Sequence, residues 1–553
     1  MLSGRKKGRG TLIMLLIMVA LIIITGCAAK APSDISSGET ESGGSPQSSG
    51  EQTAGGSTEL AQVYPLQKDV KLTYWVGVNA SVALSYTNYG DMPFFKELMK
   101  KTGVTIEFMH PVQGQESESL NILLASGELP DLIEYNWYGF MGGPEKAISD
   151  GYIRSLNDII KQYSPNLYKY LSENPIVDKM VKTDNGNYYV YPFIRGDDAL
   201  VVFVGPIVRK DWLDDLGLPL PETMDDWYQM LTAFKENKGA AAPLTYEEGL
   251  LSQGAFSGAY GVIRDFYVED GVVKYGPMEP GWRDFLAVYS KWYQEGLIDP
   301  DIAVVDRNTV GAKMTGGQAG ASMGFAGSRL GSWMQSMADV DPRYELAGAP
   351  YPVINKGEKP KFGHMDYYYG LSGSVAITTK CRDVESAARL LDYGYSEEGH
   401  MLYNFGVESV SYNIVDGYPK YTDFIMNNPD GLPINQILAG YARGIDSGPF
   451  IQDVRYHEQY ISMPQQRQAI TAWKNTDAVK YKLPPVTATP EESQEASIIM
   501  NEVNTYMQEM FFKFLMGVEP LDKFDEYVST LKELGIERVI EIKQEGIERY
   551  NNR

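Results

Sequence analysis

The chain has 553 residues, of which 72 are Asp or Glu and 49 are Lys or Arg, so its formal net charge is −23. This acidic balance argues against a general nucleic-acid-binding protein, because contact with phosphates requires a basic surface. Hydrophobic residues make up 43% of the chain and aromatic residues 12%, which is enough for a folded core and excludes a wholly disordered chain. Two cysteines are too few for a disulfide framework or a cysteine-built zinc site.

The first 26 residues have the pattern of a secretory signal. Four basic residues between positions 5 and 9 precede an apolar run over 12–24, which is short for a membrane-spanning helix. The tetrapeptide Ile24-Thr25-Gly26-Cys27 resembles the bacterial lipobox, in which the cysteine is acylated after cleavage. We therefore expect a signal peptide over 1–26 and a lipid anchor on Cys27, with an uncleaved anchor as the alternative. Both arrangements place the rest of the chain outside the cytoplasm.

Residues 27–63 are predicted to form a flexible tether. This stretch consists mainly of Ser, Gly, Thr, Glu and Pro and has almost nothing to bury. At about 5–6 Å times the square root of its length, a tether of this size has a typical span of roughly 30 Å. A folded body attached to it can move close to a membrane without entering it.

The following segments alternate between strand and helix patterns. Strands are predicted at 71–76, 104–109 and 131–135, and helices at 91–101 and 120–125. This alternation is typical of an α/β fold with a parallel sheet.

Helices dominate the remainder of the chain. A capping box at Thr223 and Asp226 starts a helix that runs to about residue 236, and a second capping box opens a long helix over 489–516. Aromatic residues recur at helical spacing over 282–293, which we interpret as a core face rather than a sugar platform. Another helix is expected over 521–534.

Seven segments together carry a family resemblance. In chain order they are FFKELMKKTGVTIEF (94–108), SGELPDLIEYNW (126–137), DNGNYYVYPF (184–193), VRKDWLDDLGLPLPETMDDWYQML (208–231), KWYQEGLIDPD (291–301), TGGQAGASMGF (315–325) and the closing helices over 514–550. Their order and content resemble bacterial extracellular solute-binding proteins of the sugar-binding type, the lipoproteins that supply ABC importers.

The resemblance implies an α/β fold of two lobes that are joined by hinge strands and close around a ligand in the cleft between them. Lobe one would hold 66–192 and about 370–450, and lobe two 193–365 and about 451–553. It also implies a monomer without cofactor, metal or catalytic residues, held by lipid at the outer face of the cytoplasmic membrane. Its expected partners are a saccharide, more specifically an oligosaccharide, and the permease subunits of an importer.

Candidate ligand contacts in lobe one follow two predicted strands, since ligands of open α/β sheets bind past the carboxyl ends of strands. Trp75 and Asn79 leave the first strand, and Asn136, Trp137 and Tyr138 leave the third. Aromatic rings can stack on the C–H faces of a sugar, while amide groups bond its hydroxyls. The alternative for either tryptophan is packing in the core or beneath a loop.

Candidate contacts in lobe two follow a glycine-rich turn where the resembled family presents ligand contacts. They are Phe325, Arg329 and Trp333. Arg209 could reach the cleft, or it could pair with Asp211 or Asp214.

Three further candidates lie near the expected return crossover and beyond it. Strand alternation puts Tyr368 on the opposite side from its two tyrosine neighbours, so only part of that run can face the cleft. Asp366 and Glu408 could accept hydroxyl bonds, although a solvated surface carboxylate is the commoner outcome for such residues.

Two other functions remain open from the sequence. A peptide- or other solute-binding lipoprotein would share the anchor and the tether. A secreted carbohydrate-active enzyme needs two carboxylates about 5–10 Å apart, and a chain with 72 acidic residues can supply such a pair. The chain has no phosphate-binding loop, so ATP hydrolysis would belong to a separate subunit.

Overall fold

The computed structural model describes residues 63–432, 434–444 and 447–553. The predicted signal peptide, the acylation site Cys27 and the tether up to residue 62 lie outside these residues. No helix of the described part combines the length and the apolar character that a membrane crossing requires.

A six-stranded sheet forms the centre of lobe one. Its strand order is β13-β4-β10-β3-β1-β2. The strands are β1 (Val70–Val76), β2 (Val104–Met109), β3 (Leu132–Tyr135), β4 (Tyr191–Arg195), β10 (Tyr369–Ile377) and β13 (Phe450–Gln452). The parallel arrangement predicted from the sequence holds for β1 with β2 and β3, whereas β10 runs antiparallel to both of its neighbours. The sheet is therefore mixed.

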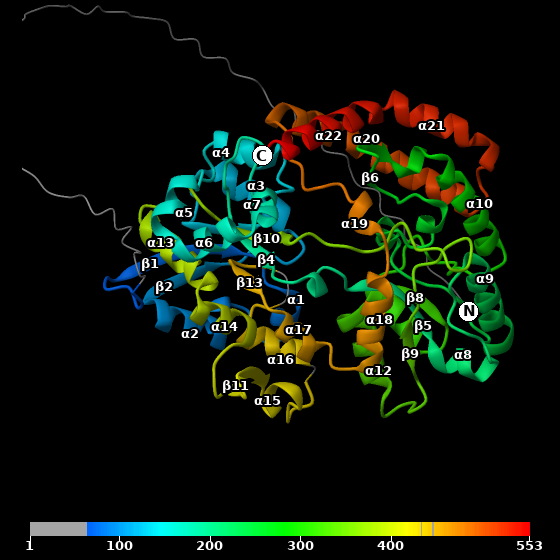
Figure 1. Cartoon of the computed structure of the whole chain (residues 1–553), viewed down its shortest axis with the longest axis horizontal. Helices are drawn as coiled ribbons and strands as arrows, with labels where there is room; N and C mark the ends of the chain where they lie inside the picture. Colours follow the sequence, from blue (N-terminus) through cyan, green and yellow to red (C-terminus); the bar gives the residue numbers. More distant parts are fainter. Residues whose placement is uncertain (1–62, 433, 445–446) are drawn as a thin grey trace, which may run out of the picture. The chain divides into compact units, whose positions relative to one another are not determined.

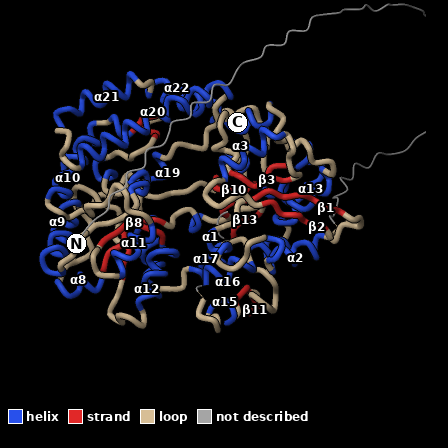
Figure 2. The backbone as a smooth tube through the Cα atoms, turned by 180° about the vertical axis from the view of Figure 1, so that it is seen from behind, coloured by secondary structure: helices blue, strands red, loops and turns tan. Residues whose placement is uncertain are grey.

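Helices cover both faces of this sheet. Figures 1 and 2 show α2 (Pro93–Thr102) on one side and α3 (Glu116–Ser126) on the other. Helix α2 begins with a proline in its first turn and ends at Gly103, which adopts a left-handed conformation with φ of 73°. The other lobe-one helices are α4 (Gly143–Ser149), α5 (Asn157–Tyr163), α6 (Pro165–Glu173), α7 (Pro175–Met180), α13 (Val384–Asp392) and α14 (Glu397–Phe405).

Lobe two contains a three-stranded antiparallel sheet of order β8-β5-β9 surrounded by helices. Its strands are β5 (Val204–Arg209), β8 (Ala321–Phe325) and β9 (Leu346–Gly348). The helices are α8 (Lys210–Leu216), α9 (Met224–Lys238), α10 (Pro280–Gln294), α11 (Arg307–Thr315), α12 (Ser332–Met337) and α18 (Pro464–Lys474). The capping box of α9 is formed as predicted, and the aromatic face of α10 is buried in the core.

Three helices near the end of the chain pack on lobe two. They are α20 (Pro490–Leu515), α21 (Phe524–Glu533) and α22 (Ile536–Asn551), and α20 begins with the predicted capping box of Thr489 and Glu492. Their apolar faces join the core that contains α10 and the hairpin β6 (Phe266–Glu269)–β7 (Val272–Tyr275).

A small third cluster lies next to lobe one. It contains the hairpin β11 (Tyr412–Val415)–β12 (Tyr418–Tyr421) and the helices α15 (Asp423–Met426), α16 (Ile434–Tyr441) and α17 (Val454–Tyr460). Its core is made of a few aromatic and aliphatic side chains around Phe405 and Ile425.

Three segments connect the two lobes. The first runs from β4 to β5, the second from β9 to β10, and the third from β13 through α17 to α18. Strands β4 and β13 extend to Arg195 and Gln452, slightly past the predicted boundaries at 192 and 450. The division into lobes at those boundaries stays a prediction.

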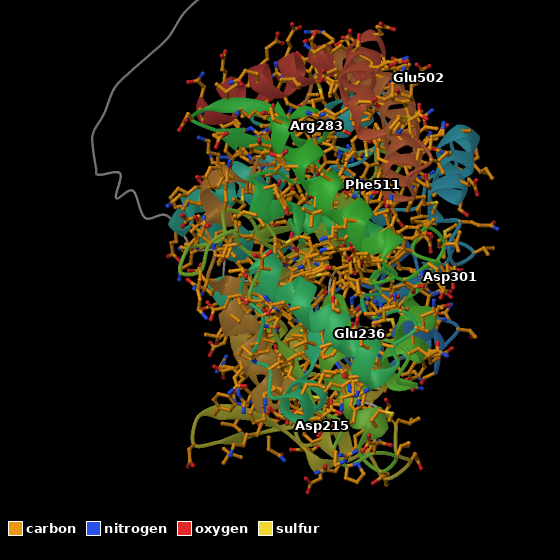
Figure 3. All side chains as sticks on the ribbon, turned by 90° about the vertical axis from the view of Figure 1, so that its right-hand side faces the viewer. Asp215, Glu236, Arg283, Asp301, Glu502 and Phe511 are labelled. Carbon is orange, nitrogen blue, oxygen red and sulfur yellow. The ribbon has the colours of Figure 1, made fainter. Side chains whose placement is uncertain are left out.

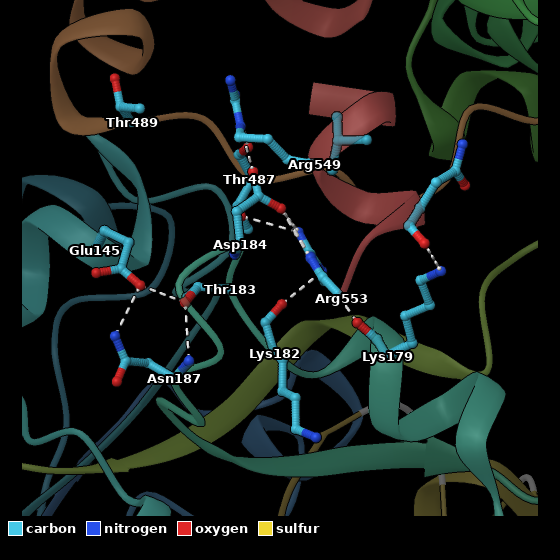
Figure 4. A network of polar contacts seen from close by, with 12 residues as sticks. Glu145, Lys179, Lys182, Thr183, Asp184, Asn187, Thr487, Thr489, Arg549 and Arg553 are labelled. Atoms are coloured by element: carbon cyan, nitrogen blue, oxygen red, sulfur yellow. Dashed lines mark hydrogen bonds and ion pairs between the residues drawn. The ribbon is translucent and has the colours of Figure 1, made fainter. Parts of the chain in front are cut away.

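A polar network joins the end of α22 to lobe one (Figure 4). Arg549 donates from Nε to Asp184 at 2.8 Å, and Arg553 donates to the same carboxylate from Nη2 at 2.6 Å. Arg553 also donates to the carbonyl oxygens of Lys179 and Lys182 at 3.0 and 2.6 Å. We call Asp184, Arg549 and Arg553 the α22 latch.

Candidate functional site

A cavity of about 250 Å³ lies between the two lobes, beside the segments that connect them. Lobe one contributes Arg195 and Gln452, and lobe two contributes Arg307, Phe325, Gly327 and Ser328. The connecting segments contribute Leu200, Phe203, Tyr456, His457, Tyr460 and Ile461. We call this the interlobe cavity.

Strand ends position the cavity. Arg195 and Gln452 are the last residues of the parallel strands β4 and β13 and lie opposite each other in the register. Phe325 is the last residue of β8. The carboxyl ends of strands are where ligands of open α/β sheets bind, so the topology converges on this position.

Two stacked aromatic pairs line the cavity. The rings of Phe203 and Phe325 lie 6.0 Å apart at 16°, and those of Tyr456 and Tyr460 lie 5.7 Å apart at 13°. A side chain at Gly327 would place its Cβ 2.5 Å from the Tyr460 ring, so the close approach requires glycine. Such flat rings can cover the apolar faces of a ligand while their rims stay wet.

Arg195 forms three side-chain hydrogen bonds at the wall of the cavity. Its guanidinium donates to Asp366 from Nε at 3.0 Å and from Nη2 at 2.6 Å, and to the Gln452 side-chain oxygen at 3.3 Å. It also lies 4.9 Å from the Phe203 ring centroid. Burial by itself would raise the pKa of Asp366, but the positive charge of Arg195 and its neighbours holds that pKa below its ordinary value.

His457 adds a neutral polar group. Burial, together with the positive charge of Arg195, lowers the pKa of His457 to about 4. At neutral pH the imidazole is therefore uncharged, with one nitrogen that donates and one that accepts.

Comparisons with known proteins agree with this architecture. No family model matches the sequence. The chain is 27% identical over 376 residues to Lipoprotein LipO of Bacillus subtilis, covering 65% of this chain and 71% of LipO. It is 24% identical over 520 residues to the fructooligosaccharide ABC transporter substrate-binding protein FusA of Streptococcus pneumoniae, covering 88% and 92% of the two chains.

A solved structure has a similar fold. The alginate-binding protein AlgQ2, in a crystal structure without calcium ion, superposes with a TM-score of 0.73 at 26% identity over 88% of this chain and 98% of AlgQ2. The chain is thus similar in sequence to the substrate-binding protein of an ABC transporter and in fold to an alginate-binding protein. FusA is named as a transport-binding protein rather than an enzyme.

Two of the predicted ligand contacts are core residues. Trp137 is fully buried and donates from Nε1 to the carbonyl oxygen of Ile133 at 3.2 Å, and Trp75 is 4% exposed. Neither ring presents a face to a ligand in this conformation, so the core alternative describes them better. Asn79 caps the short helix α1 (Ala80–Ala83), and Asn136 accepts a bond from the amide of Gly139.

Tyr138 lies at different cavities. Two cavities of about 350 and 290 Å³ share Tyr138, Asp265, Phe266 and Lys543 and lie beside the final helices of the chain. We call them the helix-side cavities. The Tyr138 hydroxyl donates to the carbonyl oxygen of Val486 at 2.8 Å, which connects lobe one to the segment that leads into α20.

Of the ligand contacts predicted in lobe two, one lines the interlobe cavity and the others are buried or paired elsewhere. Phe325 lines the interlobe cavity. Arg329 is buried in an ion pair with Glu247 and lies above the Trp333 ring, itself only 9% exposed. Arg209 pairs with Asp211 at 2.6 Å, the alternative that the sequence left open.

The last three predicted residues also occupy different positions. Asp366 lies behind the interlobe cavity and pairs with Arg195, and the Tyr368 hydroxyl donates to Asp198. Glu408 is exposed and is not among the residues that line the cavity. The role of each predicted residue in binding stays a prediction.

Sequence reasoning missed most of the residues that line the cavity. They are Arg195, Arg307, Phe203, Gln452, Tyr456, His457 and Tyr460. The usable signal was Arg195, which directly follows the apolar segment of β4. His457 stands in no local motif that marks a binding residue, since its place at the cavity depends on the course of the third connecting segment.

Proposed function

We propose that this chain is the substrate-binding component of an ABC importer and captures an oligosaccharide in the interlobe cavity. The observation that carries the proposal is the cavity lining: two stacked aromatic pairs beside the polar groups of Arg195, Gln452 and His457. A saccharide has apolar C–H faces and a rim of hydroxyls, which matches rings flanked by donors and acceptors. FusA is named for fructooligosaccharide, and a B. subtilis relative, YtcQ, for polygalacturonan and rhamnogalacturonan.

The walls of the cavity support capture by lobe closure. Phe325 belongs to lobe two and Gln452 to lobe one, so a ligand between them would bridge the lobes. Such a ligand favours the conformation in which both sets of contacts are made, which is a hinge closure. A micromolar affinity corresponds to about −8 kcal/mol, which a few stacked rings and hydroxyl bonds can supply.

Attachment to the membrane forms part of the proposal. Acylation of Cys27 would hold the monomeric body at the outer face of the cytoplasmic membrane, and the tether would allow it to reach the permease. The relative LipO carries the name lipoprotein.

Calorimetric titration separates the candidate functions. The folded body is titrated with a panel of oligosaccharides and a panel of peptides, and each saccharide is afterwards analysed by chromatography. We expect heat from at least one oligosaccharide, and its recovery intact. Binding of peptides alone would overturn the saccharide assignment, and cleavage of a glycan would favour the carbohydrate-active enzyme.

A pair of matched variants tests where the ligand binds. Tyr460→Ala removes a stacked ring of the interlobe cavity, and Tyr481→Ala removes a ring of the helix-side cavities. We expect Tyr460→Ala to weaken oligosaccharide binding about five- to thirtyfold, because a stacking ring is worth about 1–2 kcal/mol. Tyr481→Ala should leave the affinity unchanged, and the reverse result would move the ligand to the helix-side cavities.

A further inference from the structure

The interlobe cavity differs in charge from the rest of the molecule. The whole chain has 72 acidic and 49 basic residues, and exposed carboxylates such as Asp215, Glu236, Asp301 and Glu502 lie over lobe two and its covering helices (Figure 3). No Asp or Glu is among the residues that line the cavity, whereas Arg195 and Arg307 are. The helix-side cavities, in contrast, contain Asp265.

The two arginines differ in whether they have an ion-pair partner within the described part of the protein. Arg195 has a carboxylate partner in Asp366 at 2.6 Å, behind the cavity wall. Its positive charge still acts on the cavity, since it contributes to the lowered pKa of His457.

Arg307 is the second arginine of the cavity lining, and it differs from Arg195 in its partners. It is the first residue of α11, and its side chain is exposed. Within the part of the chain that the structure describes, it forms no ion pair or side-chain hydrogen bond. The neighbouring Asp306 uses its carboxylate to cap α11, accepting from the amide of Thr309 at 2.8 Å. A guanidinium on a cavity wall with no internal partner can bind a carboxylate through two parallel hydrogen bonds.

We propose that the captured saccharide is acidic and that Arg307 binds its carboxylate, so that the ligand class is uronate-containing oligosaccharides. This inference rests on the proposed function and specifies its substrate. The stacked rings would hold the sugar faces, while Arg307 would select the charged group. The hydroxyls of a neutral saccharide could accept hydrogen bonds from this guanidinium but would give it no anionic partner.

The test compares acidic and neutral ligands of the same size. The folded body is titrated calorimetrically with trisaccharides of galacturonate, glucuronate and mannuronate, with the methyl esters of each, and with neutral galactose, glucose and fructose trisaccharides. We expect at least one uronate to bind tenfold or more tightly than its own ester, and this difference to shrink as salt is raised.

Two variants of equal charge change locate the effect. Arg307→Gln should remove the preference for acid over ester. Arg343→Gln changes an exposed arginine of lobe two that does not line the cavity, and it should preserve the preference.

The outcomes distinguish this inference from the function beneath it. Tight binding of a neutral saccharide, with the uronates equal or weaker, would overturn the acidic specificity and leave the saccharide-binding function standing. An acid preference that survives Arg307→Gln would remove the role of Arg307. Failure of every saccharide, with binding of peptides, would overturn both.

Discussion

Arg195 shows how one residue can organise the junction of two lobes. It ends β4, donates to Asp366 on the segment before β10, and donates to Gln452 at the end of β13. Its guanidinium also lies over the Phe203 ring of the first connecting segment. One side chain therefore contacts the first two connecting segments and the strand from which the third begins. The carboxylate of Asp366 compensates the charge of this arginine, which is itself only 6% exposed.

Removing that carboxylate should destabilise the protein in a pH-dependent manner. Asp366→Asn leaves Arg195 nearly buried without its ionic partner, and we expect a loss of about 2 kcal/mol in the free energy of unfolding at pH 7. The pKa of Asp366 is lowered in the folded state. Its contribution is therefore complete above the unfolded value near 4 and is lost as the pH falls through the lower folded value. Denaturant unfolding of both proteins between pH 3 and 7 measures this difference.

Asp339→Asn is the matched control for this experiment. Asp339 is exposed on lobe two and accepts no side-chain hydrogen bond within the described residues. Its change should stay within about 0.5 kcal/mol at every pH. An equal effect of the two substitutions would show that the Arg195 pair contributes nothing specific.

Whole elements could be predicted wherever the signal is local. The capping boxes of α9 and α20 and the alternating strand β2 are confirmed because each depends on residues a few positions apart. The end of β13 opposite the end of β4 could not be predicted, since Gln452 and Arg195 are 257 residues apart. The interlobe cavity depends on that pairing. The residues that the third connecting segment contributes to the cavity were therefore not predicted.

The burial of the two tryptophan side chains could not be predicted from the sequence. Both Trp75 and Trp137 lie near strand ends, as the sequence indicated. The indole N–H of Trp137 is satisfied by a carbonyl only four residues away, which allows the ring to be buried in the core. The same sequence pattern fits a ring in the cleft, and only packing decides between the two positions.

The α22 latch should stabilise the end of helix α22 against lobe one. Five hydrogen bonds are made by the Arg553 guanidinium: two to Asp184, one each to the carbonyl oxygens of Lys179 and Lys182, and one to the Thr487 hydroxyl. Its side chain is 1% exposed. Arg553→Ala should therefore cost about 2–3 kcal/mol locally and raise amide hydrogen exchange in the last turn of α22 and around residues 182–188.

Arg538→Ala supplies the control on the same helix. Arg538 is 37% exposed and forms surface ion pairs with Glu495 and Glu541 at 3.3 Å. Exposed pairs of this kind contribute about 0–1 kcal/mol. Exchange near 182–188 should not change in this variant, and an equal response to both would show that Arg553 does not hold the helix to lobe one.

At the scale of the whole molecule, charge and binding are separated in space. The net charge of −23 is carried by exposed carboxylates, while the cavity-lining residues include arginines and no acids. A strongly acidic surface keeps the body soluble and gives it no basic face for anionic lipid. Attachment would then depend on the predicted lipid at Cys27, and ligand selection on the interlobe cavity.

Ligand binding should stabilise both lobes together. Because the cavity walls come from both lobes and from the connecting segments, a bound oligosaccharide favours the closed, folded state by RT ln(1 + [L]/Kd), or about 2.7 kcal/mol at 100 times Kd. We expect a higher unfolding temperature and slower amide exchange in segments 196–203 and 453–463. The hairpin of β11 and β12, which does not line the cavity, should exchange at an unchanged rate. Protection confined to one lobe would contradict closure, because a ligand that bridges the lobes cannot order one wall of the cavity and leave the other free.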